Sequence, residues 1–91
     1  MIKGFKSKSL KKLYAGDRSA IRGDLVEKSE RILSILDTAN EVEALNLPGY
    51  RLHPLKGDLK GFYSVAIRAN WRIIFQFEDG NAYEVELTDY H

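Results

Sequence analysis

The sequence predicts an α+β fold, in which two N-terminal helices pack on one face of a small, mostly antiparallel twisted sheet. In the first half of the chain, apolar residues recur at the three- to four-residue spacing of a helix. From residue 50 onward they alternate with polar residues, as in a strand that is buried on one face. An antiparallel sheet of this kind needs a covering layer, which the helices can supply. All 91 residues are expected to form a single domain, residues 1–91.

The first 16 residues are predicted to form a short strand followed by a helix. Residues 2–5 are the candidate strand, with an apolar residue at each end. Residues 7–15 place three apolar side chains at helical spacing. Gly16 is a suitable end point, because glycine readily adopts the left-handed conformation that closes many helices.

A second helix is marked by its start and by its apolar stripe. Asp24 is a suitable N-terminal cap, and Glu27 follows three residues later, as in a capping box. One further helical turn is expected at residues 42–45, and Pro48 with Gly49 ends the helical half. The apolar stripe of this helix consists of Leu25, Ile32, Leu33, Ile35, Leu36 and Ala39.

The second half of the chain is predicted to be a meander of strands. A short strand at residues 50–53 ends before Pro54, and a loop at 55–61 follows it. "EDGN" is a strong hairpin-turn signal and "RAN" a weaker one. The three clear strand patterns cover residues 63–68, 71–78 and 83–88.

These three strands are expected to present one apolar and one polar face. The apolar positions are Tyr63, Val65, Ile67, Trp71, Ile73, Phe75, Phe77, Tyr83, Val85 and Leu87. The polar face is expected to carry Ser64, Ala66, Arg68, Arg72, Gln76 and Glu84.

Composition excludes several classes of protein. The chain has no cysteine, so disulfides, thiolate metal sites and thiol nucleophiles are excluded. A domain that folds without disulfides and thiols is typical of the cytosol. No apolar run is long enough to span a membrane, and the first ten residues lack the apolar core of a signal peptide. We therefore expect a cytoplasmic protein that does not bind membranes.

Charge is unevenly distributed, although the formal net charge is only +1. Residues 1–22 carry seven basic side chains against one acidic side chain, and residues 51–75 carry five against one. This asymmetry favours a partner that bears phosphate groups. The alternative is that the lysines of residues 6–12 form an ordinary solvated helix face.

Two histidines follow predicted strands. His53 ends the first strand of the meander, and His91 follows Asp89 and Tyr90 at the end of the last. If the strand ends converge, one polar concavity would hold both imidazoles, the phenol, the carboxylate and several cations. Zinc could in principle use His53, Asp89 and His91, since three protein ligands suffice at a catalytic site, but nothing in their spacing supports it. We expect no metal and no other cofactor.

Metal-free RNA cleavage is the chemistry that suits these residue types. The ribose 2′-OH must lose a proton as it attacks the adjacent phosphate, and the departing 5′ oxygen must gain one. Histidine suits both proton transfers near neutral pH, and arginine matches the oxygens of the phosphorus intermediate. The sequence also lacks the G-x-S-x-G and P-loop motifs of other enzyme classes. A purely structural interpretation stays open, in which His53 is an ordinary hydrogen-bonded group and His91 a frayed tail.

Three motifs together resemble the HigB-type toxins of the RelE/ParE superfamily. They are "LHPLKGD" at residues 52–58, "YSVAIRANWRIIFQF" at 63–77 and the terminal "DYH". The resemblance extends over essentially the whole chain, including the opening "MIKGFKSKSLKKL". It implies the RelE/ParE-like microbial RNase fold and a metal-independent, ribosome-dependent endoribonuclease. Such an mRNA interferase cuts mRNA in the ribosomal A site and so inhibits translation.

The resemblance also implies roles for individual residues. The catalytic group that it implies consists of His53, Asp89, Tyr90 and His91. The phosphate- and RNA-binding residues that it implies are Lys56, Arg68 and Arg72, with Asn70 at a position that senses a base of the codon. The division of acid and base stays open, although a phenol titrates near pH 10, so Tyr90 as a base would need a depressed pKa.

The partners implied are the ribosome, mRNA and a helix-turn-helix antitoxin of the HigA type. Attachment to ribosomal RNA would give the basic N-terminal helix a purpose, with Lys6, Lys8, Lys11 and Lys12 as its candidate contacts. The same superfamily contains gyrase-inhibiting toxins without catalytic residues. The alternative is therefore a non-catalytic toxin, or an RNA- or protein-binding module of the same fold.

Overall fold

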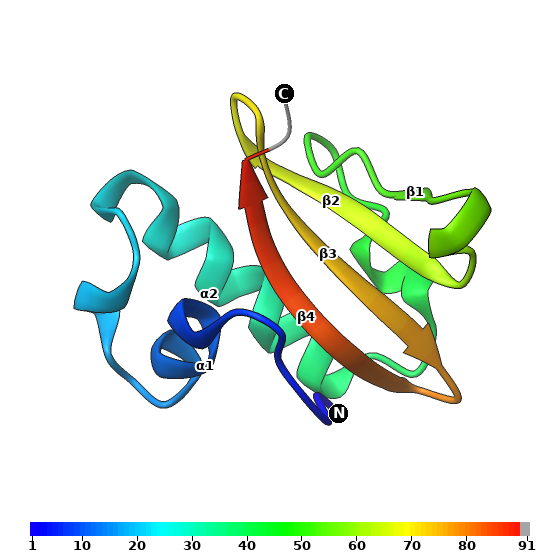
Figure 1. Ribbon diagram of the computed structural model, residues 1–91, viewed down its shortest axis with the longest axis horizontal. Coiled ribbons are helices and arrows are strands. Elements are labelled where there is room, and N and C mark those ends of the chain that lie inside the picture. Colours follow the sequence, from blue (N-terminus) through cyan, green and yellow to red (C-terminus); the bar gives the residue numbers. More distant parts are fainter. Residues whose placement is uncertain (90–91) are drawn as a thin grey trace.

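The computed structural model describes residues 1–89, which adopt the predicted α+β architecture (Figure 1). The helices are α1 (Lys8–Tyr14) and α2 (Gly23–Thr38). The strands are β1 (His53–Pro54), β2 (Phe62–Arg68), β3 (Trp71–Glu78) and β4 (Asn81–Asp89). Short 3-10 helices lie at Arg18–Ala20, Val42–Leu45 and Gly57–Leu59. In the described part of the chain, no helix is long and apolar enough to cross a membrane.

The four strands form one antiparallel sheet in the order β1-β2-β3-β4, and α2 crosses behind it (Figure 1). The core lies between the helices and this sheet. Its largest fully buried side chains include Leu10 from α1, Leu25, Ile32 and Leu36 from α2, and Val65, Ile73, Phe75 and Val85 from the sheet. The predicted helical stripe therefore faces the predicted apolar face of the meander.

Both predicted hairpin turns are present. Glu78 pairs with Asn81, and the two residues between them, Asp79 and Gly80, have φ of 52° and 77°. Two positive φ values are the mark of a type I′ turn, whose twist suits an antiparallel hairpin. The "RAN" turn is closed by Arg68 and Trp71, with φ of 51° at Ala69.

The N-terminal segment lies along the free edge of β4 rather than forming a regular strand. Ile2 forms a parallel bridge with Ala82, and Phe5 forms one with Val85. Ser7 does not cap α1 with its side chain; its Oγ accepts a hydrogen bond of 2.8 Å from the Leu87 N–H instead. The start of α1 is therefore fixed to the outer edge of the sheet.

Two predicted boundaries are wrong. The strand expected at residues 50–53 is reduced to His53–Pro54, because Arg51 has a left-handed φ of 51° that no extended strand allows. Helix α2 begins at Gly23, so Asp24 lies inside its first turn and does not cap it. A carboxylate in the first turn still interacts favourably with the helix dipole.

A bulge in β4 changes which residues face the core. Ile74 pairs with Glu86 but Gln76 pairs with Tyr83, so β4 holds one extra residue between these pairs. Glu84 has a φ of 50° at this point. As a result Ala82, rather than the predicted Tyr83, is fully buried beside Val85.

The second face of the sheet is less polar than the alternation predicts. Ile74 is buried on this face, where only polar or small side chains were expected. Ser64, which was expected there, is buried as well. Register places His53, Ser64, Ile74 and Glu86 in one row across the four strands. The candidate active site lies around His53 and Ser64 of this row.

Candidate active site

His53 is the first residue of β1, and its side chain is exposed. Its Nδ1 lies 3.1 Å from the carbonyl oxygen of Arg51. A carbonyl oxygen can only accept a hydrogen bond, so Nδ1 must carry the proton in this contact. Nε2 is then the nitrogen whose lone pair is available in the neutral ring. The backbone therefore selects a tautomer that can act as a base through Nε2.

Sheet register and a hydrogen bond place Arg72 beside Ser64, the residue that pairs with His53. His53 pairs with Ser64, and directly opposed residues of antiparallel strands project from the same face. The Nη1 of Arg72 donates a hydrogen bond of 3.4 Å to the Ser64 Oγ. The buried Ser64 hydroxyl therefore lies between a candidate base and a guanidinium that can bind phosphate.

A pocket of about 300 Å³ brings three arginines together from two parts of the chain. Arg68 and Arg72 flank the β2–β3 turn, while Arg51 belongs to the segment that leads into β1. The other lining residues are Gly49, Ala66, Ile67 and Ala69, and no carboxylate lines this pocket within residues 1–89. The concentration of guanidinium groups favours an anionic ligand.

Arg68 lies on the rim of this pocket, toward the start of α2. Its Nε is 3.5 Å from Oδ2 of Asp24, whose two carboxylate oxygens also accept hydrogen bonds of 2.6 and 2.9 Å from Arg22. These hydrogen bonds from Arg22 lower the pKa of Asp24, and the charge of Arg68 lowers it further. The guanidinium of Arg22 in turn lies 5.5 Å from the ring centroid of Trp71. Arg68 is thus held at the sheet by a carboxylate from α2.

The remaining predicted RNA contacts lie on either side of this pocket. Lys56 and Lys60 line a separate hollow of about 560 Å³ with Phe62 and Tyr63, next to β1. Asn70 is exposed in the two-residue turn between β2 and β3. A chain of RNA that crosses the arginine pocket could contact both.

Asp89 is the last described residue of β4, where it pairs with Trp71. Hydrogen bonding to Asp24 raises the pKa of Arg22, and the charge of Asp89 raises it further. Because β1 and β4 are opposite edges of the sheet, about three strand spacings, or about 14 Å, separate Asp89 from the strand of His53. Tyr90 and His91, the other two predicted catalytic residues, lie outside the described residues.

Metal ligands do not converge in the part of the chain that the structure describes. No group of three or more His, Cys, Asp or Glu side chains lies close enough there to hold a metal ion. His53 and Asp89, two of the three candidate zinc ligands, lie on opposite edges of the sheet.

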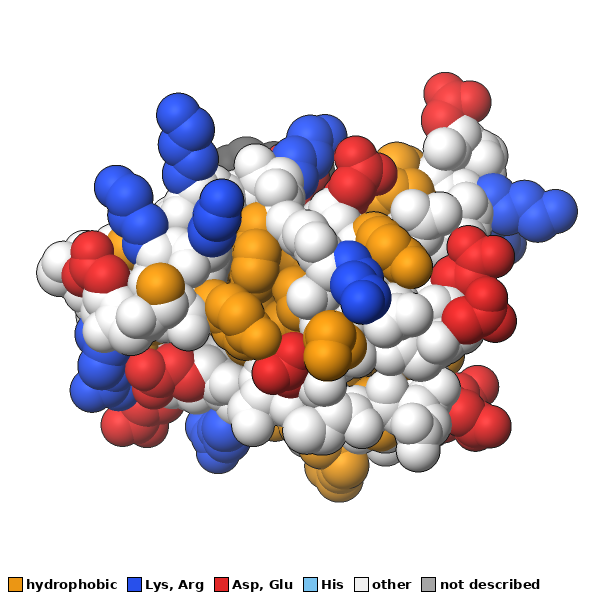
Figure 2. All heavy atoms as spheres, turned by 90° about the horizontal axis from the view of Figure 1, so that it is seen from below, with side chains coloured by type: hydrophobic (Ala, Val, Ile, Leu, Met, Phe, Trp, Pro, Cys, Tyr) orange, Lys and Arg blue, Asp and Glu red, His pale blue; other side chains and the backbone are white. Residues whose placement is uncertain are grey.

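The predicted ribosomal contacts lie at the other end of the strand order, beyond β4. Lys8, Lys11 and Lys12 are exposed on α1, while Lys6 is 4.0 Å from Glu86 of β4. Seen from below, several basic side chains stand around an apolar patch (Figure 2). Helix α1 contacts β4, whereas the arginine pocket is lined by residues from the segments 49–51 and 66–72, so the two basic groups belong to different parts of the fold.

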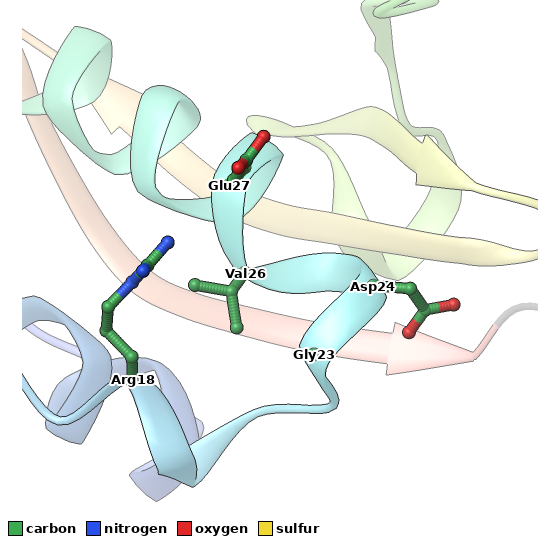
Figure 3. Close-up of a pocket in the computed structure, with 5 residues that line it drawn as sticks. All are labelled: Arg18, Gly23, Asp24, Val26 and Glu27. Carbon is green, nitrogen blue, oxygen red and sulfur yellow. The ribbon is translucent and has the colours of Figure 1, made fainter.

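A further hollow of about 500 Å³ lies at the start of α2, where Figure 3 shows Asp24 pointing away from Arg18. Two of its three charged side chains, those of Arg18 and Asp24, already have partners. Arg18 donates two hydrogen bonds to Glu30, of 3.0 and 3.2 Å, and Asp24 accepts those of Arg22. This hollow thus lacks the excess of cations that distinguishes the arginine pocket.

Arg51 is the residue that prediction from sequence did not assign to the site. The available signals were its place in the basic segment 51–75 and its position two residues before His53. Neither signal indicates that its backbone would turn left-handed and bring its side chain to the β2–β3 turn. That placement depends on the tertiary structure.

Comparison with known proteins gives consistent similarities. Residues 3–91 match the family model described as the RelE-like toxin of type II toxin-antitoxin system HigB. The chain is 48% identical over 92 residues to a protein named endoribonuclease HigB from Proteus vulgaris, with all of both chains covered. It is 37% identical over 90 residues to toxin HigB-1 from Vibrio cholerae, covering 91% of this chain and 90% of that one.

Solved structures of two other toxins share the fold. A point variant of YafQ from E. coli superposes with a TM-score of 0.64 at 19% identity, covering 98% of this chain and 93% of that one. The toxin–antitoxin complex YoeB–YefM from Staphylococcus aureus matches with a TM-score of 0.61 at 19% identity, covering 100% and 98%. At these identities the likeness concerns the fold alone.

Proposed function

The chain belongs to the HigB family of RelE-like toxins of type II toxin–antitoxin systems, and we propose that it is an mRNA endoribonuclease that cuts mRNA in the ribosomal A site. The observation that carries this proposal is the orientation of His53. Its Nδ1–H is held by the Arg51 carbonyl, so Nε2 is free to act, and Arg72 lies in the neighbouring row of the sheet. RNA cleavage requires a base and a phosphate ligand, and these two residues project from the same face of the sheet, on the two strands that flank β2.

The reaction that fits these groups needs no metal. A general base takes the proton of the ribose 2′-OH, and its oxygen attacks the adjacent phosphorus. The bond from phosphorus to the 5′ oxygen then breaks, and a general acid protonates that oxygen. The products are a 2′,3′-cyclic phosphate and a free 5′-OH. Because the nucleophile is the 2′-OH, the reaction is confined to RNA.

Cations at the site stabilise the charge that develops on phosphorus. Arg72 and Arg68 supply planar guanidinium groups that match non-bridging phosphate oxygens. Lys56 holds the RNA strand next to β1, and Asn70 lies where it could read a base from the β2–β3 turn. Preorganised charges of this kind are usually the largest single contribution to catalysis.

The catalytic group also includes Asp89, Tyr90 and His91. His53 and His91 are the candidates for the two proton transfers, and Tyr90 would stabilise the nucleophile or the leaving group through its hydroxyl. Asp89 is the last residue of β4. Bound RNA would span the sheet from the edge of β1 toward the end of β4.

The partners of the protein follow from the same proposal. Ribosomal RNA would be contacted by Lys6, Lys8, Lys11 and Lys12, and binding would weaken as salt concentration rises. A helix-turn-helix antitoxin would bind and inhibit the toxin. The solved YoeB–YefM complex is an example of a toxin of this fold bound to its antitoxin.

Primer extension on mRNA from a translating extract, with and without the protein, tests the proposal. We expect new mRNA ends in translating ribosomes and little cleavage of free RNA. Tyr90→Ala, or deletion of Tyr90 and His91, should abolish the new ends while circular dichroism and thermal unfolding stay unchanged. Cutting by the truncated protein at the wild-type rate would refute the assignment of the terminal group.

Two results would point to the non-catalytic alternative. DNA damage on expression with intact mRNA would indicate gyrase inhibition. Ribosome binding without any new mRNA ends would indicate a binding module. Either result would overturn the enzymatic proposal.

A further inference from the structure

The three guanidinium groups of the arginine pocket differ in their partners. Arg68 lies beside Asp24, and Arg72 donates to the Ser64 hydroxyl. For the guanidinium of Arg51, no hydrogen bond or ion pair is found with any described residue. Arg51 therefore brings to the pocket a positive charge that no described side chain compensates.

The backbone of Arg51 holds this charge in place at a conformational cost. Its φ of 51° is left-handed, a conformation that costs a non-glycine residue about 1–2 kcal/mol. Such a conformation persists only where the surroundings determine it. Here hydrogen bonds and strand pairing fix the chain on both sides of Arg51.

Contacts with α2 and β2 hold the residues just before Arg51. Nζ of Lys28 donates to the Gly49 carbonyl over 3.1 Å and lies 4.8 Å from the ring centroid of Tyr50. The Tyr50 carbonyl accepts a hydrogen bond of 2.7 Å from the Ala66 N–H. On the other side His53 pairs with Ser64. The strained residue is therefore fixed within the sheet-facing segment.

We propose that Arg51 is a third phosphate ligand of the active site. Together with Arg68 and Arg72, its guanidinium binds a backbone phosphate of RNA at the cleavage site. This inference rests on the proposed function, and deepens it by naming the group that the pocket binds. One residue then has two roles. Its carbonyl sets the tautomer of His53, and its side chain binds the phosphate on which that histidine acts.

Glycine at position 51 separates the two roles. Arg51→Gly removes the guanidinium, but glycine adopts a φ near 51° without strain, so the carbonyl that holds His53 stays in place. Arg51→Lys keeps the charge and loses the planar fork. Arg31→Ala, on the exposed surface of α2, removes one positive charge away from the pocket and is the matched control.

Cleavage in a translating extract is the first measurement. Loss of a charge-assisted contact predicts that Arg51→Gly cuts about 10- to 100-fold more slowly than wild type. Arg51→Lys should fall between the two, and Arg31→Ala should match wild type. Thermal unfolding of Arg51→Gly should equal that of wild type or exceed it.

Binding of a 2′-O-methyl RNA oligonucleotide, which cannot be cut, is the second measurement and does not depend on activity. Removing one phosphate contact on a single strand should reduce the slope of log affinity against log salt concentration by about 0.7. A backbone or folding role for Arg51 would not change this slope.

The two measurements distinguish failure of this inference from failure of the proposed function. If wild type produces no new mRNA ends, the proposed function fails, and the change in salt slope for Arg51→Gly still decides whether the pocket binds phosphate. If wild type cuts and Arg51→Gly cuts equally well with an unchanged salt slope, the assignment of Arg51 is overturned.

Discussion

At the scale of single residues, the site depends on hydrogen bonds that fix otherwise mobile groups. The imidazole of His53 is exposed, yet one contact with the Arg51 carbonyl selects its tautomer. Arg72 likewise donates a hydrogen bond to the Ser64 hydroxyl, and Arg68 forms an exposed ion pair with Asp24. Each of these candidate site residues therefore has a neighbour that restricts the orientation of its side chain.

His53→Ala tests the role of the histidine directly. Loss of general acid–base catalysis should lower the rate of mRNA cutting by about 100- to 10,000-fold. Because the side chain is exposed, the free energy of unfolding should change by less than about 0.5 kcal/mol. Primer extension and urea denaturation measure the two quantities. Cleavage by His53→Ala at the wild-type rate would mean that another group is the base.

At the scale of elements, α2 and β4 together hold the N-terminal segment. The carboxylate of Asp37, in the last turn of α2, accepts a hydrogen bond of 3.1 Å from the Ile2 N–H and another from the Tyr14 phenol. The Lys3 N–H donates to the Ala82 carbonyl over 2.7 Å. These contacts orient α1, which carries the lysines proposed to contact ribosomal RNA.

Asp37→Asn should therefore destabilise the protein by about 1 kcal/mol, because asparagine keeps one acceptor oxygen but loses the second and the negative charge. The Ile2 amide should also exchange its hydrogen faster. Urea denaturation at pH 7 measures the stability, with Asp58→Asn, an exposed carboxylate in the loop after β1, as the control. Equal stability of the two variants would contradict the assigned role.

The same contact predicts a dependence on pH. The hydrogen bond from the Ile2 amide, followed by that from Tyr14, lowers the pKa of Asp37 below its ordinary value of 3.8. A carboxylate whose pKa is lowered by folding contributes its full stability above the pKa of the unfolded chain and loses it as the pH falls through the folded pKa. The stability difference between wild type and Asp37→Asn should accordingly shrink as the pH is lowered below about 4.

The β3–β4 hairpin depends on glycine at position 80. With φ at 77°, alanine would be strained by about 1–2 kcal/mol, although its Cβ would meet the Asn40 carbonyl oxygen at an ordinary 3.6 Å. Gly80→Ala should lose about this much stability in urea. Gly4→Ala, where a Cβ would meet nothing within 4 Å, is the matched control and should be close to neutral. Equal midpoints for the two variants would show that the turn tolerates alanine.

At the scale of the whole molecule, charge is divided between two regions. The arginine pocket lies at the β2–β3 turn, and the lysines of α1 lie beside the β4 edge of the sheet. The net charge of +1 conceals both, because acidic residues elsewhere balance them. The proposed binding to ribosomal RNA and the proposed cleavage at one phosphate can therefore use separate surfaces of the protein.

Replacement of Lys8, Lys11 and Lys12 by glutamine tests this division. The salt dependence of ribosome binding should weaken in proportion to the number of phosphate groups that these lysines bind, while binding of the short 2′-O-methyl RNA should stay unchanged. Sedimentation with ribosomes at several salt concentrations measures the first quantity. If Arg31→Gln weakens ribosome binding as much per charge, the effect is general rather than specific to α1.

Local patterns in the sequence determined most of the elements. Three of these elements follow from side-chain period or from glycine chemistry over a few residues. They are the apolar stripe of α2, the type I′ turn at Asp79–Gly80, and the alternation of β2 and β3. The motifs around His53 and at the end of the chain indicate the family from the sequence alone. These features are local, so the sequence alone was sufficient to predict them.

Only the tertiary structure decided how the site is assembled. Three of its features depend on contacts between segments far apart in the chain. They are the left-handed backbone of Arg51, the bulge at Glu84 and the ion pair between Arg68 and Asp24. No local pattern encodes such contacts, because their free energy arises only when β2 and α2 are already packed together. The sequence therefore determined which chemical groups the protein has, and the packing of distant segments decided that three of its arginines share one pocket beside His53.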